Sequence, residues 1–117
     1  MTTEHPSELQ EWVTDRVETW VETYKKSMLT PVILRIVAQG QPVTVAEIAT
    51  QIATLTGWQV TERGLYRTIK RLQDSDLLTS QDTTAPRTGA KRKDISLTQL
   101  GDEFLSRVLA ELLILDQ

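Results

Sequence analysis

Apolar residues recur every three or four positions along most of this chain, which is the spacing of an amphipathic α-helix. The first such stretch predicts a long helix that begins after Ser7 and carries apolar side chains as far as Met28. We expect Thr30-Pro31 to end this helix and to start a second one, because proline suits the first position of a helix. Gly40 is then expected to cap the C-terminus of the second helix.

The rest of the chain predicts two more helices, a β-hairpin and a last helix. Thr44 and Glu47 have the spacing of a capping box, and Gly57 is a candidate C-terminal cap. A segment rich in turn-forming residues separates two short extended stretches and predicts the hairpin. We expect a helix over residues 44–57, a helix from Thr61 to about Asp74, strands over residues 77–81 and 92–97, and a helix after Thr98 whose apolar band reaches Leu115.

Three compact helices followed by a hairpin are the elements of a winged helix-turn-helix. In that fold the third core helix enters the major groove of DNA and the hairpin, or wing, lies along the backbone. A chain of 117 residues is expected to form one domain. The predicted fold is mainly α with a small β-hairpin, a winged helix-turn-helix with long N- and C-terminal helices. We divide it into a DNA-binding core over residues 30–97 and dimerisation helices over residues 1–29 and 98–117.

Positive charge is concentrated in one third of the chain. The net charge is −3, yet residues 61–93 carry eight basic against four acidic side chains, hence +4. On a helical wheel of the basic helix, Leu65, Ile69 and Leu72 share one face and the basic side chains lie on the other. A polyanion responds to local charge, so this helix and the wing are candidate DNA-binding elements.

Arginine and lysine at a recognition helix contact either bases or phosphates. We expect Arg63 and Arg67 to contact DNA bases because they lie near the start of the helix. The other basic residues are expected to contact phosphates. Thr61 and Thr68 are either DNA partners or simply a cap and a surface residue. The alternative for the whole set is a solvated helix face. The candidate DNA-binding residues are Arg63, Arg67, Thr68, Lys70, Arg71, Arg87, Lys91, Arg92 and Lys93.

Both terminal helices carry apolar stripes that a core of three short helices and a hairpin cannot cover. Exposed apolar patches of this size usually mark an interface. We therefore predict a two-fold homodimer, the alternative being that both helices pack back onto their own subunit. The candidate interface residues are Val13, Val17, Trp20, Tyr24, Leu105, Val108, Leu109 and Leu112.

Composition argues against several kinds of chemistry. The chain has no cysteine, and its single histidine, His5, lies in a polar N-terminal segment, so we expect no metal site, no cofactor and no catalytic triad. The stretch Gly89-Ala90-Lys91 lacks the spacing of a phosphate-binding loop, and an enzyme is not expected. No apolar run is long enough to span a membrane and no signal sequence is present, so we expect a cytoplasmic protein.

Two stretches of the chain resemble a known family. Residues 64–78, GLYRTIKRLQDSDLL, are similar to the recognition helix and first wing strand of the PadR family of winged-helix transcription regulators. Residues 89–101, GAKRKDISLTQLG, are similar to the family's second wing strand and the start of its last helix. The resemblance covers about residues 30–105 and implies repression by occupation of a promoter on double-stranded DNA. The likeness of the whole sequence to a clock regulator within the family implies a circadian clock gene as the target.

The sequence departs from the family pattern at two places in the wing. Asp76 replaces the usual glycine before the first wing strand, at a position that suits a left-handed backbone. Asp94 and Ile95 replace the usual tyrosines of the second wing strand. The aromatic contacts that relatives make there are therefore not expected in this protein.

Two other functions remain open. The fold could serve as a protein-interaction module whose basic face meets an acidic partner. A ligand-sensing regulator with an aromatic pocket at the dimer interface is also considered, because some PadR proteins bind aromatic effectors and Trp12, Trp20 and Trp58 could line such a pocket. The simpler interpretation is packing, with Trp20 in the stripe of the first helix, Trp12 at its edge, and Trp58 closing the turn before the basic helix.

Overall fold

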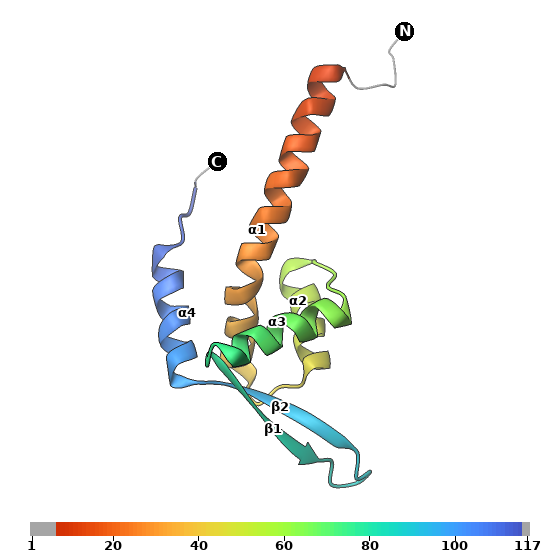
Figure 1. Ribbon diagram of the computed structural model, residues 1–117, viewed down its shortest axis with the longest axis vertical. Helices are drawn as coiled ribbons and strands as arrows, with labels where there is room; N and C mark the ends of the chain where they lie inside the picture. The colour runs from red at the N-terminus through yellow and green to blue at the C-terminus, as the bar shows by residue number, and fades with distance from the viewer. Residues whose placement is uncertain (1–6, 116–117) are drawn as a thin grey trace.

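The computed structural model describes residues 7–115, and this part of the chain forms four α-helices and one β-hairpin (Figure 1). His5 lies outside the described residues. The predicted fold class, mainly helical with one antiparallel hairpin, is confirmed. The elements in order are α1 (Glu8–Gly40), α2 (Val45–Thr56), α3 (Glu62–Asp74), β1 (Leu78–Thr84), β2 (Lys91–Leu97) and α4 (Gln99–Glu111).

Each helix begins at a hydroxyl side chain that caps its first turn. Ser7 and Thr44 each accept a backbone N–H from three residues on, and the glutamine or glutamate there accepts the N–H of the cap residue, which completes both predicted capping boxes. Thr61 and Thr98 cap α3 and α4 by accepting the corresponding N–H. Gly57 ends α2 with a left-handed φ of 77°, as predicted.

The predicted break after the first helix is wrong, because α1 is one continuous helix of 33 residues that runs through Pro31. A proline inside a helix removes one backbone hydrogen bond and crowds the preceding turn. Here Pro31 is buried and Ile33 follows it in the core, so tertiary packing outweighs the local preference. Gly40 is also not a left-handed cap: it is the last helical residue, and the chain leaves through the extended Gln41. The proposed boundary between residues 29 and 30 lies inside this helix.

The core forms where the C-terminal part of α1 meets the other elements. α1 packs against α2, α4 and β2, while α3 packs against α2 and β1. This arrangement holds α3 with its apolar side inward and leaves its basic side free. The largest fully buried side chains are Ile33, Leu34, Val37, Ile48, Ile52, Leu65 and Ile95.

The hairpin is longer than predicted, since β1 extends to Thr84 and β2 already starts at Lys91. The two strands pair antiparallel along their whole length. A bridge between Val43 and Ile95 attaches the chain before α2 to the other edge of β2. Because side chains alternate across a strand, the face that carries the buried Ile95 is turned inward and the alternate residues form an outer face.

The base of the wing is bonded to the start of α4. Asp76 has a φ of 62°, which confirms the left-handed backbone predicted for it. The hydroxyl of Thr98 donates to the carbonyl of Asp76 at 2.6 Å and lies 3.1 Å from that of Leu77. α4 ends at Glu111, earlier than predicted, and the apolar residues 112–115 are exposed, so they add no packing against this chain that would extend the helix.

The molecule is elongated because the N-terminal part of α1 projects beyond the core (Figure 1). Its extents are 66 × 35 × 24 Å, and its radius of gyration is 18.5 Å, against about 13 Å for a compact domain of this length. Apolar side chains on the projecting part, among them Val13, Val17 and Trp20, are exposed. No helix within residues 7–115 is long and apolar enough to cross a membrane.

Candidate nucleic-acid interface

α3 has one apolar and one basic side. Leu65, Ile69 and Leu72 are buried against the core. Among the basic residues of α3, only Lys70 lies within 4.0 Å of an acid in the described chain. Its Nζ is 3.9 Å from Oδ1 of Asp74, and this exposed ion pair contributes little to stability. The positive charge of the helix is therefore available to a ligand. The exposed basic residues are Arg63, Arg67, Lys70 and Arg71.

Thr68 is a weaker candidate for DNA contact than the basic residues around it. It is half-buried, and its Oγ1 donates to the carbonyl of Gly64 at 3.0 Å. The hydroxyl hydrogen is thus used within the helix, and the oxygen can only accept from another group. A phosphate offers acceptors only, so a role for Thr68 on DNA would require it to accept a hydrogen bond from a base or a water.

Lys93 of the wing lies beside the basic side of α3. A surface hollow between the two elements is lined by Arg67 and Lys70 on α3 and by Lys93 on β2. Nε2 of Gln73 donates to Oγ of Ser80 at 2.6 Å and ties α3 to β1 directly next to it. The structure therefore places Lys93 of the wing on the same surface as Arg67 and Lys70 of α3. Tyr66, half-exposed at its edge, lines the same hollow.

The basic residues of the wing were predicted to contact DNA as one group, but they lie on different faces of the wing. Lys91 and Lys93 share the inner face of β2, whereas Arg92 lies on the outer face with Asp94. Arg87 is exposed in the turn between the strands. Only Lys91 and Lys93 are therefore on the same face of β2, toward α3.

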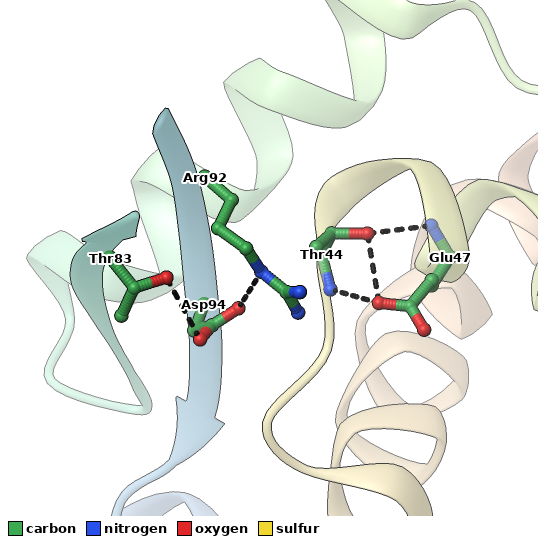
Figure 2. A network of polar contacts seen from close by, with 5 residues as sticks. All are labelled: Thr44, Glu47, Thr83, Arg92 and Asp94. Carbon is green, nitrogen blue, oxygen red and sulfur yellow. Dashed lines mark hydrogen bonds and ion pairs between the residues drawn. The ribbon is translucent and has the colours of Figure 1, made fainter. Parts of the chain in front are cut away.

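Arg92 belongs to a hydrogen-bonded cluster on the wing, and this cluster faces a second, separate cluster at the start of α2 (Figure 2). Its Nε donates to Oδ1 of Asp94 at 3.0 Å, and Oδ2 of Asp94 accepts from Thr83 on β1 at 3.3 Å. On the α2 side, the N–H and hydroxyl of Thr44 both donate to Oε1 of Glu47 at 2.9 Å. These two hydrogen bonds, with a smaller contribution from the charge of Arg92, lower the pKa of Glu47.

Several of these polar residues were not predicted. The pairing of Arg92 with Asp94 follows from strand alternation, which places residues two apart on one face, so the sequence did hold that signal. The contact of Gln73 with Ser80 joins elements whose relative placement no local pattern encodes. Glu47 was predicted as part of a capping box, but its closeness to Arg92 depends on the bridge between Val43, just before α2, and Ile95 of β2.

The predicted dimer residues fall into exposed and buried sets. Leu105 is only 5% exposed and belongs to the core of its own subunit, so its assignment to a dimer interface is wrong. Leu112 lies just beyond the end of α4. Val108 is half-buried, and the remaining predicted residues are exposed: Val13, Val17, Trp20, Tyr24, Leu109 and Leu112.

Two of the three tryptophans, Trp20 and Trp58, meet at the ring of Tyr24. Trp20 stacks on Tyr24 with centroids 5.6 Å apart, and Tyr24 meets Trp58 edge-on at 6.1 Å. Trp58 packs against the core, in agreement with its predicted place in the turn before α3. Trp12 lies under Arg16, whose guanidinium is 4.8 Å from the ring centroid.

Comparisons with known proteins agree with this geometry. The sequence model of the "Transcriptional regulator PadR-like family" matches residues 33–107, more than half of the chain. A PadR-like transcriptional regulator from Bacillus cereus has 26% identity and a TM-score of 0.67, with 75% of this chain and 84% of that chain covered. A PadR family regulator from Eggerthella lenta has 22% identity and a TM-score of 0.73, with 86% of each chain covered.

A third similar structure is Bacillus subtilis PadR in complex with operator DNA. It has 22% identity and a TM-score of 0.65, with 77% of this chain and 52% of that chain covered. At this identity the likeness concerns the fold. No match was found among curated proteins.

Proposed function

Because this chain belongs to the PadR-like family of transcriptional regulators, we propose that it binds operator DNA as a homodimer and represses the promoter that it occupies. One observation carries the proposal: Lys93 of the wing and Arg67 and Lys70 of α3 line one surface. Positive charge drawn from two separate elements onto one face fits the polyanionic backbone of a duplex. Bacillus subtilis PadR, which has a similar fold, forms a complex with operator DNA, and this supports DNA as the ligand of this chain.

In the proposed complex α3 enters the major groove and the wing lies along the backbone. Arg63 and Arg67 occupy the first half of α3, from which side chains of a recognition helix reach base edges. Lys70, Arg71, Lys91 and Lys93 neutralise phosphates. These phosphate contacts supply affinity for any sequence, whereas the base contacts select one.

A homodimer would cover the apolar surface that the monomer leaves exposed. The accessible surface is 9231 Å², whereas a compact protein of 13.3 kDa exposes about 6,500 Å². Part of this difference lies along α1, where Val17 and Trp20 are exposed to water. A two-fold dimer through α1 and α4 would bury this stripe and present two α3 helices to half-sites about one turn of DNA apart, or a multiple of it.

The identity of the target is a further part of the proposal. We propose further that the chain is a counterpart of Pex, the period-extending regulator of the cyanobacterial circadian clock, and that the regulated gene is a clock gene. Repression would then follow from occupation of its promoter. A footprint on the promoter of such a gene would test this part separately from DNA binding itself.

Binding that depends on sequence is the decisive test of the proposal. The wild-type protein would first select an operator from random duplexes, and its affinity would then be compared with that for a scrambled duplex of equal length. We expect the operator to bind at least roughly tenfold more tightly at physiological salt. Equal binding to both would contradict the proposal and favour the alternative function, capture of an acidic protein partner.

Single substitutions then test the surface. Arg67→Ala should cost about 1–3 kcal/mol of operator binding and relax the preference at one base position. Arg107→Ala is the matched control, since Arg107 is exposed on α4 and pairs there with Glu103. Equal losses in the two variants would show that α3 is not the recognition helix.

A further inference from the structure

Arg92 and Asp94 form a pair whose geometry suggests more than a surface ion pair. We propose that Asp94 is a positioning residue, which holds the guanidinium of Arg92 so that its terminal amino groups bind one operator phosphate in the gap between the wing and the start of α2. This inference rests on the proposed function, because it concerns how the same protein grips DNA. It assigns Asp94 a role that its negative charge alone would argue against.

The carboxylate of Asp94 is fixed from two sides. Oδ1 accepts from Nε of Arg92 at 3.0 Å on β2, and Oδ2 accepts from Oγ1 of Thr83 at 3.3 Å on β1. The Asp94 side chain is 17% exposed, whereas that of Arg92 is 45% exposed. A half-exposed arginine is therefore anchored at its inner edge by a largely buried acid.

The anchor leaves the outer edge of the guanidinium for a ligand. Arginine has five N–H donors in a planar fork, and Asp94 uses the one on Nε. For the Nη groups of Arg92, the described residues provide no hydrogen-bond acceptor. Figure 2 shows these nitrogens pointing from β2 toward Thr44 at the start of α2. Two such amino groups match the oxygens of a phosphate, and an arginine that is already held in place loses less conformational freedom on binding.

Glu47, the acidic residue in the first turn of α2, does not form a hydrogen bond with the guanidinium of Arg92. Glu47 directs Oε1 to the N–H and hydroxyl of Thr44 instead, both at 2.9 Å. No ion pair within 4.0 Å joins Glu47 to Arg92. The first turn of α2 adds the positive end of a helix dipole to the same gap, which partly offsets the negative charge that Glu47 carries there.

This arrangement gives the experiment two opposite outcomes. If Asp94 acted only through its charge, its removal would strengthen DNA binding, because an acid near a phosphate repels it. If Asp94 positions Arg92, Asp94→Ala should weaken operator binding about threefold to tenfold, which is the effect of misplacing one charge-assisted hydrogen bond. Asp94→Asn keeps an oxygen that can accept from Nε of Arg92, so it should reduce the affinity for the operator less than Asp94→Ala does.

Asp82→Ala is the matched control for charge. Asp82 is exposed on β1 of the same hairpin, and in the described chain it makes no ion pair and no side-chain hydrogen bond. Its removal should strengthen operator binding slightly, because Asp82 lies directly opposite Lys93 in the hairpin and its charge opposes a phosphate there. A loss equal to that of Asp94→Ala would overturn the inference.

A double-mutant cycle identifies the residue through which Asp94 acts. In an Arg92→Ala background, Asp94→Ala should cause no further loss, because the positioned group is gone. Arg92→Lys keeps the charge without the planar fork, so it should bind almost as weakly as Arg92→Ala, and it also tests the idea if the Asp94 variants fold poorly. Thermal unfolding of each variant checks that the fold is kept.

The results separate this inference from the proposed function. If the wild-type protein does not distinguish operator from scrambled duplex, the proposed function fails before any variant is compared. If the wild-type protein does distinguish the two duplexes, DNA binding stands and the variants test the positioning role. That role is wrong if Asp94→Ala binds the operator as tightly as wild type, or if it reduces the affinity equally with and without Arg92. Likewise, an Arg92→Lys variant that binds like wild type would overturn it.

Discussion

Gly101 lies where the first turn of α4 touches the base of the wing, so Gly101→Ala tests the packing that joins the two. A Cβ at this position would lie 2.1 Å from the carbonyl oxygen of Leu77 and 2.9 Å from Cδ1 of Leu97. The oxygen cannot move freely, because the backbone N–H of Thr98 donates to it at 3.2 Å. α4 or the wing base must therefore shift by roughly 1 Å to restore an ordinary contact.

The expected effect is the difference between two opposing contributions. Overpacking of this kind costs about 1–3 kcal/mol or more, while alanine is favoured over glycine within a helix by about 1 kcal/mol. The backbone clash is severe, so we expect a net loss near 2 kcal/mol, or a melting temperature lower by roughly 8 °C.

Thermal and urea unfolding at one fixed protein concentration would measure this loss, since the stability of a dimer depends on concentration. Gly40→Ala is the control. Its Cβ would lie 3.3 Å from Cγ1 of Val43, a side-chain atom near the end of α1, and a change within about 0.5 kcal/mol is expected. If Gly101→Ala unfolds at the wild-type temperature or above it, α4 does not pack on Leu77 as described.

Two further substitutions test the dimer and the start of α2. Val17→Asp places a charge on the exposed apolar stripe of α1, and we expect sedimentation equilibrium to show monomers in place of a dimer. Thr19→Asp is the control, because Thr19 lies on another side of the helix and its substitution should leave the dimer intact. A dimer that survives both substitutions would exclude this stripe from the interface. Glu47→Gln should lower stability at pH 7, because the folded protein holds the pKa of Glu47 below its unfolded value and so gains stability above that value. This contribution disappears as the pH falls through the lowered pKa of Glu47, so the difference in stability between variant and wild type should shrink as the solution is acidified below the ordinary pKa of a glutamate. A difference that does not change with pH would refute the role of the charged carboxylate.

The local parts of the fold could be predicted from the sequence because their causes are local. A hydroxyl residue followed by a helical pattern identified the caps at Thr44 and Thr61, and their hydrogen bonds are present. Asp76 was expected to take a left-handed backbone because it replaces a glycine, and its φ is 62°. The basic side of α3 followed from helical periodicity alone.

The errors arose where distant packing decides the outcome. Pro31 remains helical because the residues after it are buried in the core, and no pattern within a few residues of it reports that burial. Leu105 and Leu109 belong to the same apolar band in the sequence, yet only Leu105 meets the core. A hydrophobic stripe shows that burial is favoured, but it does not show whether the partner is the same chain or another.

The separation of charge along the molecule explains how an acidic protein can present a DNA-binding face. The acids of the first turns of α1, such as Glu8 and Glu11, lie at the end of the molecule opposite the wing, and the molecule is 66 Å long (Figure 1). At physiological salt, exposed charges are screened beyond about 8 Å, so these acids contribute little to the potential at α3. A duplex near the wing therefore responds to Arg67, Lys70 and Lys93 and not to the net charge of −3. As a polyanion approaches, the acidic end turns away and the basic end turns toward it, so the same acids that make the protein negative favour the orientation in which α3 meets DNA.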